Sequence, residues 1–430
     1  MIDKRFSSLV LYITFCLIVF YPFKGIVSFL WSFFFGVNLS VIVIPFLFMI
    51  TFSFVLLNMA VNHVFFPRRT DVILLALGFV GLACALLKQD NSLFYNTFLL
   101  FFLPVLFSPM GKIDERFFFN TVVLFFTLST MYLLGENIVL HPARFGLSFK
   151  APNFEQLCYY TNFLVSSPDY NALLNLDDTR HTGTANRTGG YLGNILAMPV
   201  LISMAATFFY VVMRERITFA YFILTLISVF LLISCRSTTA IIAFILTILF
   251  YEVYARENYS FIFLSIAMIF ILLTVSDTLS FVYRRLLSNL NDPGYFATFF
   301  NYNVLFTHEN LPYLIYGKWS WSPTRGASSH VDLMNIVVVY GGIVAYLLYR
   351  RILFPLSSLK RTGTMWQRTY SLVILTAFIC LFHSSMTLNI NNMMLVTLLM
   401  VKSSQIHNSR GDGNAVEMAL LDTTNTERNA

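Results

Sequence analysis

A histidine and an aspartate stand at the head of one long apolar stretch of the chain. His330 and Asp332 are followed by apolar sequence that continues to Tyr349 and includes the pair Gly341-Gly342. Near neutral pH an imidazole can accept a proton from a hydroxyl group or bind a phosphate. The pair is therefore a candidate for proton transfer where a membrane helix begins. The alternative is a structural histidine at the membrane interface.

Two arginines occupy places where a charge is costly. Arg236 lies in the short polar run Ser234–Thr239 between two apolar runs, where a charge close to hydrocarbon usually has a partner. The neighbouring hydroxyl groups suit a phosphate site, although a side chain that snorkels to the headgroups would also explain the position. Arg187 precedes Gly189 and Gly190, which allow close backbone approach to a ligand or to another helix. Free N–H groups at a helix entry favour an anion.

The composition indicates the class of protein that must position these residues. Of 430 residues, 57% are hydrophobic and only 11% are charged, and runs long enough to cross a bilayer recur along the chain. We expect an all-α, polytopic helical membrane protein. The net charge of +7 comes from dispersed clusters rather than from a basic stripe, so no nucleic acid is expected as a partner. The cysteines show neither a disulfide framework nor the spacing of a metal site.

The apolar runs predict twelve membrane-spanning helices. The predicted spans lie near residues 8–35, 39–65, 71–87, 93–110, 117–134, 189–213, 217–235, 238–255, 259–282, 331–349, 370–386 and 388–402. The first span contains Pro22 and Lys24, and we expect it to bend or break there.

Basic residues gather in alternate connections between these spans. Pairs such as Arg68-Arg69 and Arg350-Arg351 mark the cytoplasmic side by the positive-inside rule, so both termini are predicted inside. Residues 1–402 then form a single polytopic membrane domain, and the polar residues 403–430 form a flexible cytoplasmic tail. Two long loops, about 135–188 and 283–330, fall on the outer face.

The outer loops contain arginines against the positive-inside bias. Besides Arg187, they include Arg284, Arg285 and Arg325. Their position indicates an anionic ligand outside the membrane. Ion pairs with acidic residues of the same loops are the alternative.

Four stretches resemble, in order, motifs of the O-antigen polymerase and ligase superfamily of integral membrane glycosyltransferases. They are NRTGGYLGNILA (Asn186–Ala197), SCRSTTAIIAFIL (Ser234–Leu246), PYLIYGKWSW (Pro312–Trp321) and SHVDLMNIVVVYGGIVAYL (Ser329–Leu347). The resemblance covers residues 186–349 closely and the remainder only by topology. Many members have His-Asn where this chain has His330-Val331-Asp332, and a spaced glycine pair where Gly341 and Gly342 are adjacent.

The resemblance implies transfer of a glycan from an undecaprenyl-diphosphate donor to a sugar hydroxyl of another lipid-linked repeat unit. The reaction would take place at the periplasmic face of the bacterial inner membrane. We expect a metal-independent reaction without a cofactor, in which guanidinium groups grip the diphosphate oxygens. The candidate catalytic residues are His330, Arg236 and Arg187, and the candidate substrate-binding residues are Arg284, Arg285, Arg325 and Asp332.

Two other functions fit the same sequence. An O-antigen ligase would move finished polymer to lipid A-core with the same donor and the same arginines. A flippase or transporter of lipid-linked glycans also fits about twelve spans, although the long outer loops and the absence of an internal repeat favour an enzyme. The partners expected for a polymerase are the undecaprenyl-diphosphate-linked oligosaccharide, membrane lipid and a protein that regulates chain length.

Overall fold

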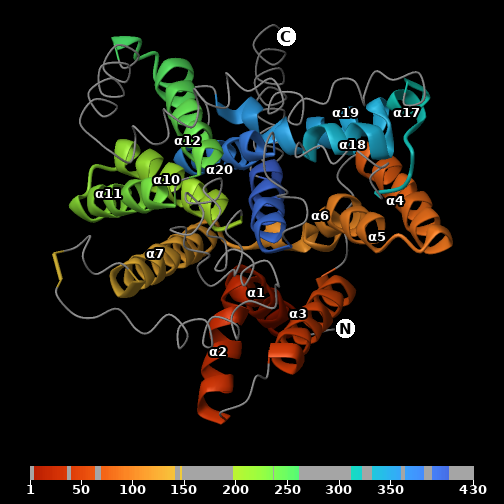
Figure 1. Ribbon diagram of the computed structural model, residues 1–430, viewed down its shortest axis with the longest axis horizontal. Coiled ribbons are helices and arrows are strands. Elements are labelled where there is room, and N and C mark those ends of the chain that lie inside the picture. Colours follow the sequence, from red (N-terminus) through yellow and green to blue (C-terminus); the bar gives the residue numbers. More distant parts are fainter. Residues whose placement is uncertain are drawn as a thin grey trace, which may run out of the picture.

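The computed structural model describes residues 4–35, 40–62, 69–140, 146–147, 197–235, 237–260, 311–321, 332–359, 364–381 and 390–405. In these ranges every regular element is a helix and no strand occurs (Figure 1). Six helices in the same ranges are long and apolar enough to cross a membrane. The chain is therefore an all-α, membrane-embedded protein, as its apolar runs predict.

The six long helical segments coincide with the first six predicted spans. They are Lys4–Val27, Ile42–Asn62, Thr70–Lys88, Asn91–Lys112, Glu115–Ile138 and Ala197–Glu215. Shorter apolar helices cover Phe219–Ser234 and Thr239–Ala255. The predicted ninth span, near residues 259–282, lies outside the described residues apart from its first two positions.

The first span breaks where the sequence places Pro22. Helix α1 (Lys4–Phe20) gives way to the 3₁₀ turn η1 (Tyr21–Phe23), and α2 (Lys24–Phe35) follows. Proline has no N–H for the helical ladder and its ring crowds the preceding turn, so the helix changes direction there. Helix α3 (Ser40–Asn62) packs on both halves.

The next two spans form a tight antiparallel pair. Helix α4 (Arg69–Lys88) turns at Gln89-Asp90 into α5 (Asn91–Thr97). The same span then continues through the π-helical turn η2 (Phe98–Phe102), α6 (Leu103–Leu106) and η3 (Ser108–Lys112). Helix α7 (Glu115–Leu140) follows and packs on α1.

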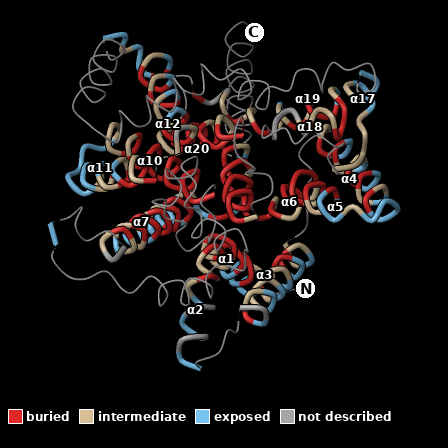
Figure 2. Tube along the Cα trace, in the orientation of Figure 1, coloured by how far each residue is buried: buried red, intermediate tan, exposed pale blue. Residues whose placement is uncertain are grey.

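Helix α10 (Ala197–Glu215) is the centre of the second group of helices. Fifteen of its 19 residues are buried, against α7, α11 (Phe219–Ser234), α12 (Thr238–Phe250) and α20 (Met365–Cys380). Figure 2 shows this burial as a red centre flanked by exposed outer turns. Hydroxyl groups link three of the helices, because Thr376 Oγ1 lies 2.9 Å from Thr207 Oγ1 and donates to Thr247 Oγ1 at 3.1 Å.

The stretch that the sequence predicts as one span over residues 331–349 is two helices. Helix α18 (Asp332–Tyr340) ends at Gly341, and α19 (Gly342–Leu353) begins directly afterwards. Gly341 has a φ of +86°, which a continuous helix cannot contain. The short helix α17 (Leu311–Tyr316) packs on both halves, and α19 also packs on α4, so these four helices gather at one edge (Figure 1). The 3₁₀ helix η7 (Phe354–Leu359) and a final helix over 390–405 complete the described chain.

Ion pairs and hydrogen bonds between helix ends agree with the prediction that successive spans cross the membrane in opposite directions. Each bond joins two ends that the alternating layout places on the same side. On the side predicted to be cytoplasmic, the bonds are Arg214–Glu252 and Arg368–Glu215 at 2.8 Å, Arg351–Asp71 at 3.2 Å and Lys112 Nζ to the Asn62 carbonyl at 2.9 Å. The opposite ends are called outer below.

Candidate functional site

Most of the predicted site residues lie outside the part of the chain that the structure describes. These are Arg187, Arg236, Arg284, Arg285, Arg325 and His330. Asp332 is the first residue of α18, and its backbone alone is described. The described residues next to them are Cys235 and Ser237 on either side of Arg236, and Trp321, which precedes the ten-residue stretch 322–331 that carries Arg325 and His330.

Two of the motifs named above cross at a pair of glycines. Gly317, in the motif Pro312–Trp321, follows the short helix α17 and has a φ of +75°. Gly341, in the motif Ser329–Leu347, separates α18 from α19. A Cβ atom on Gly317 would lie 2.5 Å from the carbonyl carbon of Tyr340, and one on Gly341 would overlap the carbonyl oxygen of Ile315. Only glycine fits either position, because both the φ angle and the backbone contact exclude a side chain. We call this crossing, which consists of residues 317–321, the end of α18 with Gly341 and the adjacent α4–α5 turn, the outer junction.

The segment after Gly317 satisfies the backbone at the end of α18. Lys318 N–H donates to the carbonyl of Val338 and Trp319 N–H to that of Val339, each at 2.8 Å. The last carbonyls of a helix have no partner within the helix, so these bonds compensate for the break at Gly341. The indole Nε1 of Trp319 donates to the Tyr316 carbonyl at 3.0 Å.

Tyr340 fastens the outer junction to α5 and η2. Its side chain is fully buried, and its hydroxyl lies 3.0 Å from Thr97 Oγ1. The ring makes edge contacts with Phe101, at 5.1 Å between centroids, and with Trp319, at 5.6 Å. These contacts fix the end of α18 against the fourth span.

Two residues of the α4–α5 turn hold the other side of the segment. Lys88 Nζ donates to the carbonyls of Lys318 and Trp319, both at 3.0 Å. Asp90 accepts from Leu93 N–H at 2.9 Å through one oxygen and thereby caps α5. Its other oxygen accepts from Ser320 Oγ at 3.0 Å and from Trp321 N–H at 2.6 Å.

Backbone strain concentrates in the outer junction. The described chain has six residues with positive φ, and four of them lie here: Gln89, Gly317, Trp319 and Gly341. Positive φ is costly for glutamine and tryptophan and persists only where surrounding contacts hold it. Such strain is typical of functional sites, and the outer junction therefore is the best candidate site among the described residues.

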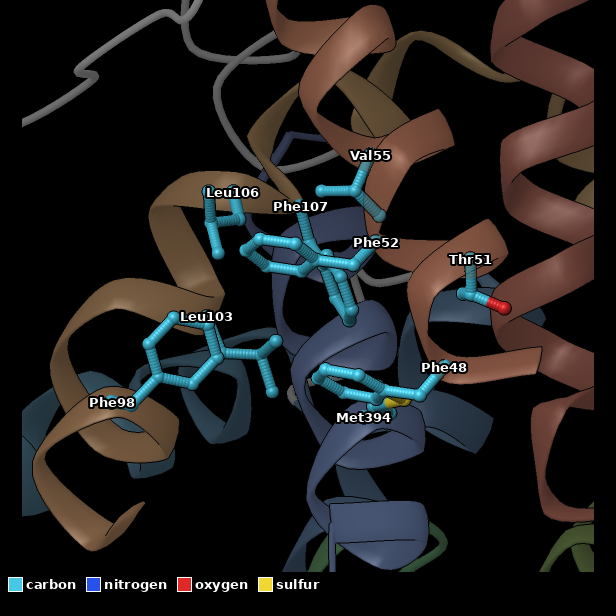
Figure 3. Close-up of a pocket in the computed structure, with 9 residues that line it drawn as sticks. All are labelled: Phe48, Thr51, Phe52, Val55, Phe98, Leu103, Leu106, Phe107 and Met394. Atoms are coloured by element: carbon cyan, nitrogen blue, oxygen red, sulfur yellow. The ribbon is translucent and has the colours of Figure 1, made fainter. Parts of the chain in front are cut away.

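A metal centre is not found in the described ranges, and the hollow beside α3 is apolar. These ranges contain no group of three or more His, Cys, Asp or Glu side chains that could hold a metal ion. A hollow between α3, η2 and the final helix is lined by apolar side chains and by Thr51 (Figure 3). The Thr51 hydroxyl donates to the Leu47 carbonyl at 2.9 Å, so the hollow offers hydrocarbon contact and no reactive group.

The sequence indicates some of this arrangement and misses the rest. The motifs at Pro312–Trp321 and Ser329–Leu347 include both crossing glycines. The contributions of Lys88 and Asp90 were not predicted, because both residues lie in the short polar connection between the predicted spans 71–87 and 93–110. An aspartate directly before a helix is a cap signal, but nothing near it in the sequence indicates the contact with Trp321.

No family model, no curated protein and no solved structure matches this chain. What the chain does is therefore inferred from its motifs and from the outer junction.

Proposed function

We propose that this protein is an O-antigen polymerase of the bacterial inner membrane. It transfers a glycan from an undecaprenyl-diphosphate donor to the terminal sugar hydroxyl of another lipid-linked repeat unit. The observation that carries the proposal is the crossing of Gly317 with Gly341, because it brings into contact two motifs that resemble the polymerase and ligase superfamily.

The proposed topology has twelve spans with both termini in the cytoplasm. The loops 135–188 and 283–330 then face the periplasm, and residues 403–430 are a cytoplasmic tail. The bonds between helix ends support the alternation of crossings, since Arg214–Glu252 and Arg368–Glu215 join ends assigned to the cytoplasm. The positive-inside rule supplies the direction.

The proposed chemistry divides the work between cations and a base. The bond between the sugar's anomeric carbon and the diphosphate oxygen breaks, and the acceptor oxygen forms the new bond while its proton passes to His330. Arg236 and Arg187 stabilise the negative charge that grows on the diphosphate. Guanidinium groups bind phosphate oxygens in pairs and stay charged, so the reaction needs no metal ion. Cleavage of the sugar–diphosphate bond supplies the free energy, so no ATP is needed.

The remaining predicted residues bind the two lipid-linked substrates. Arg284, Arg285 and Arg325 contact the donor diphosphate, and Asp332 orients a sugar hydroxyl. The outer junction supports this arrangement, because Trp321 and the start of α18 are the described ends of the stretch that carries Arg325. A chain-length regulator in the same membrane is the proposed protein partner.

The surface polysaccharide of a deletion strain tests the proposal. We expect deletion to leave lipid A-core with a single repeat unit, and the wild-type protein to restore the ladder of longer chains. Arg236→Ala should fail to restore it at equal membrane abundance, while Arg428→Ala in the tail should restore it fully. Bare core with polymer retained on the carrier lipid would instead identify a ligase. Bare core without outward-facing intermediates would identify a flippase and refute the enzyme.

A further inference from the structure

We propose that Asp90, which lies outside the predicted catalytic set, is a positioning residue for the transfer reaction. It holds Ser320 and Trp321, the last two residues of the outer segment (residues 317–321), and so sets where the stretch with Arg325 and His330 begins. This inference rests on the proposed function. The reacting groups remain those already named, and Asp90 acts on them through Ser320 and Trp321.

The two oxygens of Asp90 do different work. One accepts from Leu93 N–H at 2.9 Å and caps α5, which ties the carboxylate to a membrane helix. The other accepts from Ser320 Oγ at 3.0 Å and Trp321 N–H at 2.6 Å. Bonds to an ionised acceptor are shorter and stronger than bonds between neutral groups. The carboxylate is thus a bridge between a helix and the outer segment.

The outer segment is also held by the end of α18, by Lys88 and by the Trp319 ring, which contacts the Tyr340 ring. Lys318 and Trp319 donate to the end of α18, and Lys88 grips the carbonyls of the same two residues. These bonds stop at Trp319, and two residues, Ser320 and Trp321, lie between it and the stretch 322–331. Among the described hydrogen bonds, those to Asp90 extend the hold to Ser320 and Trp321, and the Trp321 side chain also packs against the hydrophobic core.

The position of Trp321 matters because of chain length. Arg325 is four residues beyond it, and each extended residue adds about 3.3–3.6 Å of reach. Release at Trp321 therefore widens the range of positions open to a cation that must meet a diphosphate. A misplacement of about 1 Å can cost on the order of 100-fold in rate. The Asp90 carboxylate therefore raises the transfer rate by fixing the position of Trp321.

Asp90→Asn separates positioning from helix capping. Asparagine caps a helix as well as aspartate does, so α5 keeps its start, whereas the ionised acceptor for Ser320 and Trp321 is lost. Asp114→Asn is the matched control, because Asp114 caps α7 by accepting from Phe117 N–H at 3.0 Å at the opposite end of the helices. Ser320→Ala removes one of the two bonds from the partner's side.

The assay is transfer by the purified full-length protein in lipid nanodiscs with a synthetic lipid-linked repeat unit. For Asp90→Asn we expect kcat to fall about 10- to 100-fold with KM changed less than about threefold. Ser320→Ala should also lower kcat. Adding it to Asp90→Asn should lower kcat little further, because the two substitutions remove the same hydrogen bond. Asp114→Asn should keep the wild-type kcat.

Amide hydrogen exchange supplies a readout that does not depend on activity. Exchange in a peptide that covers residues 317–321 should become faster in Asp90→Asn and stay unchanged in Asp114→Asn. A wild-type kcat in Asp90→Asn overturns the positioning role, and so does a loss of activity without faster exchange in that peptide. A wild-type protein without transfer activity refutes the proposed function itself, which is a different result from either of these.

Discussion

Replacing Gly341 by alanine adds one methyl group where α17 and the break between α18 and α19 cross. The new Cβ would overlap the carbonyl oxygen of Ile315 and lie 2.9 Å from Gly317 N. The residue would also have to keep a φ of +86°, which L-amino acids rarely adopt. Both effects act on backbone atoms, so no rotation of a side chain can relieve them.

The expected loss follows from these two effects. Holding a residue other than glycine at such an angle costs about 1–3 kcal/mol, and forcing neighbouring backbone apart costs about 1–3 kcal/mol more. The two are not additive, because a shift that relieves one relieves part of the other. We expect Gly341→Ala to lower the free energy of unfolding by about 3 kcal/mol.

Unfolding in mixed micelles of a mild detergent and SDS, followed by tryptophan fluorescence, measures this loss. Gly135→Ala is the control, since a Cβ there meets nothing within 4 Å and the residue lies inside α7. Alanine in a helix interior is favoured over glycine by about 0.5–1 kcal/mol, so this variant should be slightly more stable. A loss below about 1 kcal/mol in Gly341→Ala would refute the reasoning about the crossing.

Three further results are expected. Arg214→Ala should lower the free energy of unfolding by about 2–3 kcal/mol in the same assay, because the buried Glu252 carboxylate keeps only weaker partners. Adding Glu252→Gln should recover part of this loss. An equal loss in the double variant would contradict the pairing. Thr97→Val and Tyr340→Phe should each cost about 1 kcal/mol, and together less than their sum, because they share one buried hydrogen bond; additive losses would show that the bond contributes nothing. Chelation of divalent cations with EDTA should leave the transfer rate unchanged, because arginines supply the positive charge in the proposed site; activity restored by Mg²⁺ after chelation would refute this.

The helices were predictable because a bilayer imposes one dominant pattern on the sequence. Long apolar runs must be helical in hydrocarbon, since an open backbone there has no partner for its N–H and C=O groups. The break at Tyr21–Phe23 was also predictable, because Pro22 acts through local sterics. Both signals lie within a few residues of the structure they cause.

The break at Gly341 and the role of Asp90 have distant causes. From Ile336 to Tyr349 the chain has no charged or amide side chain, and its pattern there is the same for one helix as for two. The break is stabilised by Lys318 and Trp319, which lie about twenty residues earlier, within the motif Pro312–Trp321. Asp90 and Trp321 are 231 residues apart in the chain. Contacts of this kind depend on how the helices pack, and one sequence contains no periodic signal for them.

Formation of a polymer by the purified protein tests the central claim most directly. The protein is reconstituted into vesicles with a fluorescent lipid-linked repeat unit, and the products are separated by size. The proposed polymerase should extend the repeat unit to dimers and longer chains that remain on the carrier lipid, and Arg236→Ala should form none while it unfolds like the wild type. Failure to extend the repeat unit, with transfer occurring only when lipid A-core is added, would contradict the polymerase and identify a ligase.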